Sequence, residues 1–314
     1  MDPSSQHDRL KHRLRHHRPG RQVIPAQAAR WGELIIPAAD ENPDKGRDGL
    51  RIVAVTSFWF GYLALETIKA YESRYPGQLN LVAVITDDPV DPGARISLKK
   101  RIWHFVPPKY YLDIESRTIE AALAFGIPVY TGEIKCDWFR RQLREWQPDV
   151  VICCGFGQLM DKAFLSLPSM GTINIHPSDL AASHGAGPAP HKDVFQRNAE
   201  FSRWTAHQMN EEIDAGRIIG SSPRIRITHN RSGVDYHPLH YYHKLMRDGL
   251  DYMVVALLDS LCRKYAVGDL SAVNSVDFEQ AVPHPIKCRM LEPCEDFRLE
   301  LPMPEPDKDL FSKQ

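Results

Sequence analysis

Short apolar runs alternate with amphipathic stretches through the middle of this 314-residue chain, and that alternation limits its fold more than any other feature. The apolar runs predict strands at residues 51–56, 81–86, 127–130, 149–154 and 171–176. The amphipathic stretches between them predict helices at 62–72, 116–125 and 137–146. Strands that alternate with helices in this way are typical of βαβ units. We therefore expect an α/β fold with a Rossmann-like, mostly parallel sheet.

The later part of the chain completes this domain. Residues 204–209 and 217–228 have the pattern of strands, and residues 239–261 have the spacing of a long amphipathic helix. The sequence thus predicts one domain at 49–266, with a basic extension at 1–48 and a Pro-rich, irregular tail at 267–314.

The extension carries a basic cluster at 9–18, which we interpret as a solvated arm or a short packed helix rather than a phosphate contact. We expect that deletion of residues 1–40 leaves the function of the domain measurable.

Charge and hydropathy exclude several classes of protein. The net charge is −1, so the whole chain has no bulk attraction to nucleic acid or to an anionic membrane. No apolar run approaches the roughly 20 residues that cross a bilayer, and the N-terminus lacks the apolar core of a signal peptide. The six cysteines show no Cys-x-x-Cys spacing, so buried thiols in a reducing compartment are expected. We predict a cytoplasmic protein without a membrane partner.

The turn after the first predicted strand argues against nucleotide cofactors. A dinucleotide site needs Gly-x-Gly-x-x-Gly there, so that the backbone can approach a pyrophosphate. Residues 57–62 instead read Ser-Phe-Trp-Phe-Gly-Tyr, with one glycine among bulky aromatic residues. The chain also lacks a phosphate loop of the Gly-x-x-x-x-Gly-Lys-Ser/Thr type. NAD, FAD and ATP are therefore not supported, and neither is an oxidoreductase.

Two polar residues end the strand at 171–176, where folds of this type place their ligands. Asn174 and His176 are two positions apart, so their side chains share one face of the strand. One supplies an amide donor and the other a group that titrates near neutrality. Further on, Asp214 stands in a turn, and a carboxylate that reaches an imidazole can orient it, as in catalytic triads.

These segments resemble the 10-formyltetrahydrofolate-dependent formyltransferases, which include methionyl-tRNA, glycinamide ribonucleotide and amino-sugar formyltransferases. The family's Asn-x-His-Pro-Ser motif matches residues 174–178, its Gly-rich loop matches 185–188, and its Asp-x-Gly-x-Ile motif matches 214–218. The resemblance covers roughly residues 50–265, and the order and spacing of the motifs make it specific. The chain departs from the family at 179–181, which read Asp-Leu-Ala, and at 182–184, which lack a frequent arginine. These departures concern the acceptor pocket more than the catalytic centre.

The resemblance implies roles for individual residues. It implies that Asn174, His176 and Asp214 are catalytic, with Asp214 raising the pKa of His176, and that no metal takes part. The co-substrate would be 10-formyltetrahydrofolate, and the segment after the strand at 149–154 would grip its pterin ring. The residues implied to bind the co-substrate are Gly155, Phe156, Gly157, Gln158, Leu159 and Gly216.

The acceptor is the least constrained part of this interpretation. We predict a small amine, either an amino sugar nucleotide or an amino-acid-like amine, and we do not expect a nucleic acid. Transfer-RNA formyltransferases add a C-terminal barrel, whereas this chain from residue 269 onward has ten acidic and five basic residues, the wrong balance for phosphate. The alternatives are a methionyl-tRNA formyltransferase, a hydrolase of the same folate and a non-catalytic folate-binding protein. A homodimer remains compatible with the sequence.

Overall fold

A nine-stranded mixed sheet forms the centre of the computed structural model, which describes residues 18–27, 29, 32–42, 45–87, 111–227 and 238–276. The strand order is β1-β2-β5-β4-β3-β6-β7-β9-β10. These strands are β1 (Gln22–Pro25), β2 (Gly32–Ile36), β3 (Leu50–Thr56), β4 (Leu79–Thr86), β5 (Val129–Gly132), β6 (Val150–Cys154), β7 (Thr172–His176), β9 (Thr205–Gln208) and β10 (Ile218–Ser221). A separate small sheet pairs β8 (Phe201–Ser202) with β11 (Ile225–Arg226).

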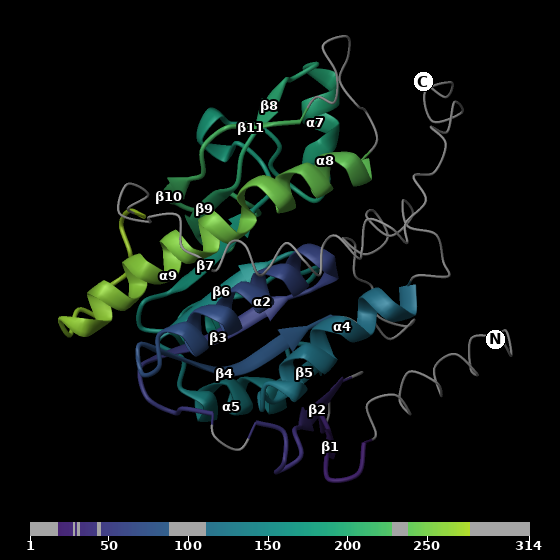
Figure 1. Ribbon diagram of the computed structural model, residues 1–314, viewed down its shortest axis with the longest axis vertical. Helices are drawn as coiled ribbons and strands as arrows, with labels where there is room; N and C mark the ends of the chain where they lie inside the picture. Colours follow the sequence, from purple (N-terminus) through teal and green to yellow (C-terminus); the bar gives the residue numbers. More distant parts are fainter. Residues whose placement is uncertain are drawn as a thin grey trace, which may run out of the picture.

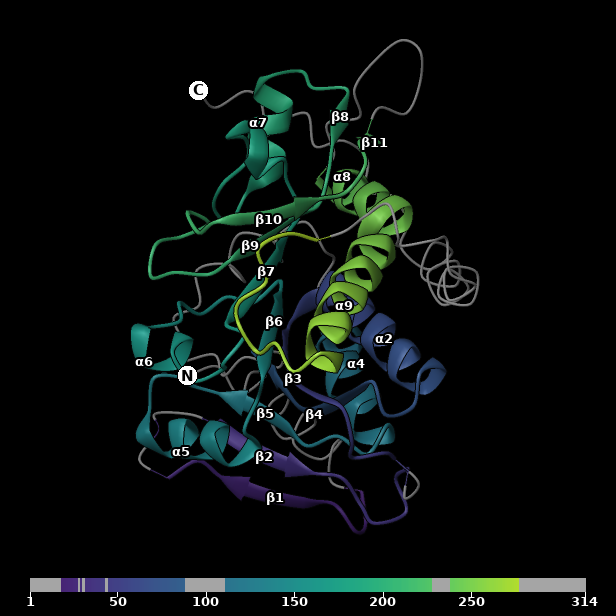
Figure 2. The ribbon, with the colours of Figure 1, turned by 90° about the vertical axis from the view of Figure 1, so that its left-hand side faces the viewer.

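Helices cover both faces of the sheet. They are α2 (Phe58–Arg74), α4 (Tyr111–Ala124), α5 (Asp137–Trp146), α6 (Lys162–Leu165), α7 (Pro190–Gln196), α8 (Pro238–Leu245) and α9 (Asp251–Ala266), with a 3₁₀ turn η3 (Leu180–Ala182) and a π-helical turn η4 (Met246–Leu250). Figure 2 shows α2, α4 and α9 on one side of the sheet and α5 and α6 on the other. The strands and helices predicted between residues 51 and 176 alternate as expected (Figure 1).

The centre of the sheet is parallel. Strand β3 pairs in parallel with β4 and β6, and the parallel ladder continues to β5 on one side and to β7 on the other. Antiparallel strands β2 and β1 extend the first edge, and β9 and β10 extend the second. The predicted mostly parallel α/β sheet is therefore confirmed, with antiparallel margins.

Side chains along the central strand β3 alternate between the two faces of the sheet. They therefore belong to two hydrophobic clusters, one under each layer of helices. Ile52 and Ala54 of β3 belong to the cluster that packs under α2, α4 and α9. Val53 and Val55 point to the opposite face and pack with α5 and α6. All four side chains are fully buried. A strand buried on both faces reads as a continuous apolar run, which is why the sequence identifies it readily.

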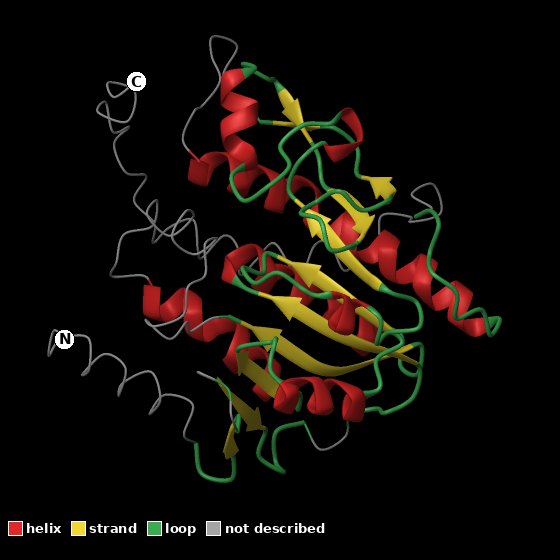
Figure 3. Cartoon of the chain, turned by 180° about the vertical axis from the view of Figure 1, so that it is seen from behind, coloured by secondary structure: helices red, strands yellow, loops and turns green. Residues whose placement is uncertain are grey.

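The N-terminal part of the chain differs from its prediction. Residues 22–36 lie inside the segment predicted as an extension, yet they form the hairpin of β1 and β2, and β2 pairs with β5. Figure 3 shows this hairpin at one edge of the sheet. Ile35 is fully buried there and Leu34 nearly so. Deletion of residues 1–40 would therefore remove two strands of the sheet, not only an arm. The basic cluster at 9–18 falls almost wholly outside the described residues.

Two elements of the second half also differ from their predictions. The strand predicted at 217–228 is divided into β10 and β11, because Pro223 cannot donate to a ladder. The helix predicted at 239–261 is present, but the π-helical turn η4 divides it into α8 and α9. The Trp204 indole donates to the carbonyl of Leu245 (2.8 Å), the residue that precedes this turn.

Candidate active site

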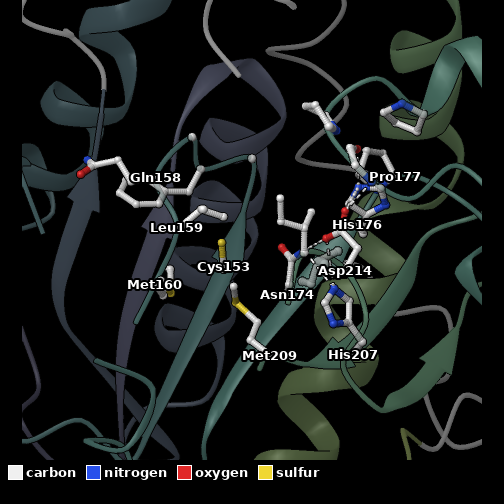
Figure 4. Close-up of a pocket in the computed structure, with 18 of the residues that line it drawn as sticks. Cys153, Gln158, Leu159, Met160, Asn174, His176, Pro177, His207, Met209 and Asp214 are labelled. Carbon is white, nitrogen blue, oxygen red and sulfur yellow. Dashed lines mark hydrogen bonds and ion pairs between the residues drawn. The ribbon is translucent and has the colours of Figure 1, made fainter. Parts of the chain in front are cut away.

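A pocket lies beside the carboxyl ends of β6 and β7 (Figure 4). The loop after β6 forms one side of it, and residues 187–190 with the β9–β10 connection form much of the rest. Strand β7 supplies Asn174 and His176. Their chain neighbours Ile173 and Ile175 alternate to the other face and are fully buried in the core. The two polar side chains are thus held at the pocket by a strand that the core fixes in place.

Asp214 connects these two residues. Its Oδ1 accepts a hydrogen bond from Asn174 Nδ2 (3.3 Å), and its Oδ2 lies 3.3 Å from His176 Nε2. The Gly187 N–H also donates to Oδ2 (2.7 Å). Asp214 has a positive φ of 52°, a left-handed conformation that aspartate tolerates better than most residues. The structure therefore brings together the three residues predicted as catalytic.

A fourth polar residue, His207, completes this cluster. It lies opposite Asn174 in the β7–β9 ladder, and its side chain is almost fully buried. His207 Nε2 is 3.1 Å from Asn174 Nδ2 and 3.6 Å from Asp214 Oδ1, while Nδ1 is 3.3 Å from the Gln208 carbonyl. In this arrangement Nδ1–H donates to the Gln208 carbonyl and Nε2 accepts from Asn174 Nδ2. Sequence analysis gave His207 no role, because the pairing of β7 with β9 is not visible in the sequence.

The residues after β7 are held by buried hydroxyl groups. Ser178 Oγ is 2.8 Å from His176 Nδ1, and Thr205 Oγ1 donates to the Ser178 carbonyl (2.7 Å). Tyr241 OH donates to the Pro177 carbonyl (2.5 Å). When Ser178 donates to Nδ1, the proton of a neutral His176 is on Nε2, the nitrogen that faces Asp214. The neighbours of His176 therefore set its tautomer.

Burial decides the charge state of the cluster. It lowers the pKa of His176 below its usual value, and the Asp214 carboxylate opposes this shift only in part. Burial alone would raise the pKa of Asp214, but His207, His176 and the Gly187 N–H outweigh it and lower that pKa to about 2. The expected upward effect of Asp214 on the pKa of His176 is present, but the net shift is downward. At neutral pH the site holds an aspartate and a neutral imidazole.

The loop after β6 supplies five of the residues predicted to bind the co-substrate, and all five line the pocket: Gly155, Phe156, Gly157, Gln158 and Leu159. Other parts of the chain hold the loop in place. The Gly157 N–H donates to Asp87 Oδ2 (2.8 Å), and Gln158 Nε2 donates to the Gly132 carbonyl (2.8 Å). Asp87 follows β4, and sequence analysis did not connect it with this loop.

Gly216, the sixth residue of that predicted set, has a different position. It is not among the residues that line the pocket. A Cβ at Gly216 would lie only 1.6 Å from the Gln208 carbonyl oxygen. Glycine is needed here because the β9–β10 connection passes directly against the backbone of β9. The geometry gives Gly216 a packing role that supports the turn of Asp214, in place of a ligand contact.

The fold and this cluster define an α/β protein with a buried Asn–His–Asp site on a pocket at the carboxyl edge of its sheet. The chain belongs to the formyl transferase family, whose model matches residues 67–238. The match includes the strands and loops that carry Asn174, His176, His207 and Asp214. Membership therefore rests on the part of the chain that builds the site, in agreement with the resemblance inferred from its motifs.

Curated relatives match parts of the chain, and a solved structure shares its fold. The methionyl-tRNA formyltransferase of Methylacidiphilum infernorum (isolate V4) is 31% identical over 182 residues, which are 55% of this chain and 47% of that protein. That of Lysinibacillus sphaericus is 37% identical over 100 residues, 32% of this chain and 31% of the relative. The chain thus spans less than half the length of these relatives. The phosphoribosylglycinamide formyltransferase of Anaplasma phagocytophilum shares the fold, with 18% identity, a TM-score of 0.51, and coverage of 68% and 87% of the two chains.

The described residues offer neither a membrane span nor a cluster of metal ligands. No helix among them is both long and apolar enough to cross a membrane. No group of three or more His, Cys, Asp or Glu side chains in this part of the chain is arranged to hold a metal ion.

Proposed function

We propose that this protein transfers the formyl group of 10-formyltetrahydrofolate to the amine of a small-molecule acceptor, an amino sugar nucleotide or an amino-acid-like amine. One observation carries the proposal: Asp214 bridges Asn174 and His176 at a pocket in a member of the formyl transferase family. Acyl transfer to an amine needs donors for an oxyanion and a group that moves a proton, and this cluster supplies both.

The loop after β6 is the proposed site of the folate. It offers backbone groups of Gly155 and Gly157 beside the apolar side chains of Phe156, Leu159 and Met160. A pterin ring has two flat apolar faces and an edge of hydrogen-bonding groups, so it suits a loop that presents both kinds of contact. Figure 4 places Gln158, Leu159 and Met160 on one side of Asn174, and His176 and Pro177 on the other. The folate and the acceptor would thus approach the cluster from opposite sides.

The reaction would proceed through a tetrahedral intermediate. The neutral acceptor amine attacks the formyl carbon, a C–N bond forms, and the carbonyl electron pair moves to oxygen. Asn174 Nδ2 and His176 Nε2 would donate to that oxyanion, and one such donor is typically worth ~3 kcal/mol of barrier. The amine then loses a proton and N10 of the folate gains one as its bond to the formyl carbon breaks. The Asp214 carboxylate helps to relay this proton through water from the amine to N10, while the Nε2–H of His176 stays on the oxyanion.

The hydrogen bonds of Asn174 indicate what the substrate must displace. Asn174 Nδ2 contacts both Asp214 Oδ1 and His207 Nε2, so its donors are already in use. Binding of the formyl oxygen would draw one of these N–H groups away from Asp214. Catalytic hydrogen bonds of this kind commonly tighten only when the substrate is bound.

A direct transfer assay tests the proposal. The protein is incubated with folate labelled with ¹³C in the formyl carbon and with a panel of amines that includes an amino sugar nucleotide, amino-acid amides and methionyl initiator tRNA. We expect labelled formyl on a small amine, detected by mass. Label released only as formate would indicate a hydrolase, and label on the tRNA alone would indicate a methionyl-tRNA formyltransferase.

Two variants make the assay specific to the site. His176→Ala removes the imidazole of the cluster, and His184→Ala is the matched control, because His184 lies in the same loop region but does not line the pocket. The proposal requires loss of transfer in the first variant and retention in the second. Equal activity in the two would contradict it. Stabilisation by a reduced folate, but not by NAD, is the expected binding result.

A further inference from the structure

The turn between β3 and α2 has an unusual composition for its place in the fold. In Rossmann-like proteins the first strand leads into a glycine-rich turn, and the helix that follows directs its N-terminal N–H groups at a phosphate. Here the first residue of α2 is Phe58, whose positive φ of 62° is a conformation that glycine would adopt without strain. Its ring is nevertheless buried and stacks on Phe60 at 5.7 Å. The packing of the rings therefore holds an unfavourable backbone conformation in place.

A carboxylate already lies beside this turn. Asp87, which is almost fully buried, accepts a hydrogen bond from Ser57 Oγ, and its own N–H donates to Ser57 Oγ (3.1 Å). Ser57 is the residue that precedes α2. A phosphate at this end of the helix would have to lie near a buried negative charge. Like charges in a region of low dielectric repel strongly.

Two aromatic rings fill the space between the turn and the pocket, and both are almost fully buried, with Phe60 2% and Tyr242 1% exposed. Phe60 lines the pocket and stacks on Tyr242 with ring centroids 5.9 Å apart and planes inclined by 18°. Tyr242 also lines it, and its hydroxyl is 3.0 Å from Nδ1 of the buried His191. Pro188 and Pro190 line the pocket as well. A Cβ on Gly155 would be only 2.1 Å from the Phe60 ring, so this ring is packed directly against the folate loop.

The charged groups of the pocket have one sign. Among the described residues that line it, Glu211, Glu212 and Asp214 carry a negative charge, and none is a lysine or an arginine. Phosphate recognition normally depends on such cations or on free backbone N–H groups. An amine, in contrast, is attracted to carboxylates.

From these contacts we infer that the acceptor carries no phosphate and that its amine points to His176 and Asp214. This inference rests on the proposed function and narrows it. Of the two acceptor classes expected from the sequence, it selects the amino-acid-like amine and excludes the amino sugar nucleotide.

A matched pair of acceptors tests the inference. L-tyrosine amide and O-phospho-L-tyrosine amide differ only in the phosphate, and a uridine diphosphate amino sugar serves as a second phosphate-bearing acceptor. We expect kcat/KM for tyrosine amide to exceed that for either phosphate-bearing acceptor by at least ~10-fold, because a buried like charge opposes the phosphate. Binding of the folate is measured in parallel by its effect on the melting temperature.

The outcomes separate this inference from the proposed function. Faster transfer to a phosphate-bearing acceptor, or no transfer to tyrosine amide by protein that binds the folate, would overturn the inference. Absence of both folate binding and transfer to every amine would overturn the proposed function itself.

Discussion

Two clusters of buried charged and polar side chains lie at opposite parts of the sheet, and they differ in what their groups can still bind. In the N-terminal cluster, Arg21 is buried between Glu41 and Glu120. Its Nε and Nη2 donate to Glu41, and Nη1 and Nη2 donate to Glu120. Glu41 also accepts from the Ala38 N–H (2.8 Å). Burial alone would lower the pKa of Arg21, but its two carboxylate partners outweigh this effect.

The cluster around Asp214 is arranged differently. Asn174, His176 and Asp214 contact one another but also line a pocket. Figure 4 shows the Asn174 amide oxygen directed away from Asp214, toward the loop after β6. Asp214 adopts a left-handed backbone conformation, which costs free energy of about 1–3 kcal/mol in such cases. The N-terminal cluster is thus a closed set of charges that joins β1 and β2 to α4, whereas the Asp214 cluster is an open set that lines a pocket.

The largest expected effect is the loss of turnover when residues of the open cluster are substituted. Asn174→Ala and Asp214→Asn should each lower turnover by at least ~10²-fold, because one removes an oxyanion donor and the other removes the carboxylate that relays the proton. Steady-state kinetics with circular dichroism measures activity and fold together. Asp137→Asn is the matched control, since Asp137 is exposed on α5. Full activity in either site variant would mean that the open cluster is no more functional than the closed one.

Substitution in the closed cluster should lower stability and leave turnover unchanged. Arg21→Ala leaves Glu41 buried without its partner, and loss of one member of a buried pair typically costs about 3–5 kcal/mol of stability. Urea unfolding should show this loss, while turnover per folded molecule stays unchanged. Arg144→Ala, at an exposed position of α5, should change neither quantity. A stable Arg21→Ala protein with reduced turnover would mean that the hairpin contributes to the site.

A smaller effect is expected at His207, which we regard as a positioning residue. His207→Phe keeps a ring of similar size but removes the acceptor for Asn174 Nδ2, and should lower kcat by about 10-fold, the equivalent of one hydrogen bond to a polar group. The KM for the folate should remain close to that of the unmodified protein. His207→Gln, which can still accept a hydrogen bond, should recover part of the loss. A wild-type kcat in His207→Phe would show that His207 does not position Asn174.

The smallest effect is on the pH dependence. The pKa of His176 is lowered in the folded protein, so kcat/KM should be level near neutrality and fall only below the usual histidine value of about 6.5. Its contribution to stability is complete above that unfolded-state pKa and is lost as the pH falls through the lower folded-state pKa. The pKa of Asp214 is about 2, so Asp214 does not contribute to this limb. An activity midpoint above 6.5 would contradict a neutral His176 beside an ionised Asp214.

The sequence predicted the parallel centre of the sheet and the three residues of the site for a shared physical reason. Strands buried on both faces are continuous apolar runs, and polar residues at their ends stand out. Asn174 and His176 could be placed on one face from their spacing alone. Their contact with Asp214 was inferred from the order of motifs, and the distances now show the three side chains together.

Other features depend on pairings between distant segments. The hairpin of β1 and β2 consists of four- and five-residue strands in a polar region, and only its pairing with β5 makes it part of the sheet. His207 lies opposite Asn174 because of the register between β7 and β9. Gly216 follows an Asp-x-Gly motif that indicated a ligand contact, but its surroundings show a close approach of two backbone segments.

The catalytic role of the open cluster is tested most sharply by comparing His176→Ala with Arg21→Ala at equal concentrations of folded protein. Formyl transfer from labelled 10-formyltetrahydrofolate to an amine is measured in a single turnover for each. We expect that His176→Ala folds normally and transfers at least ~10²-fold more slowly, whereas Arg21→Ala is less stable but transfers at the normal rate. A folded His176→Ala protein with near-normal transfer would contradict the catalytic role of this cluster.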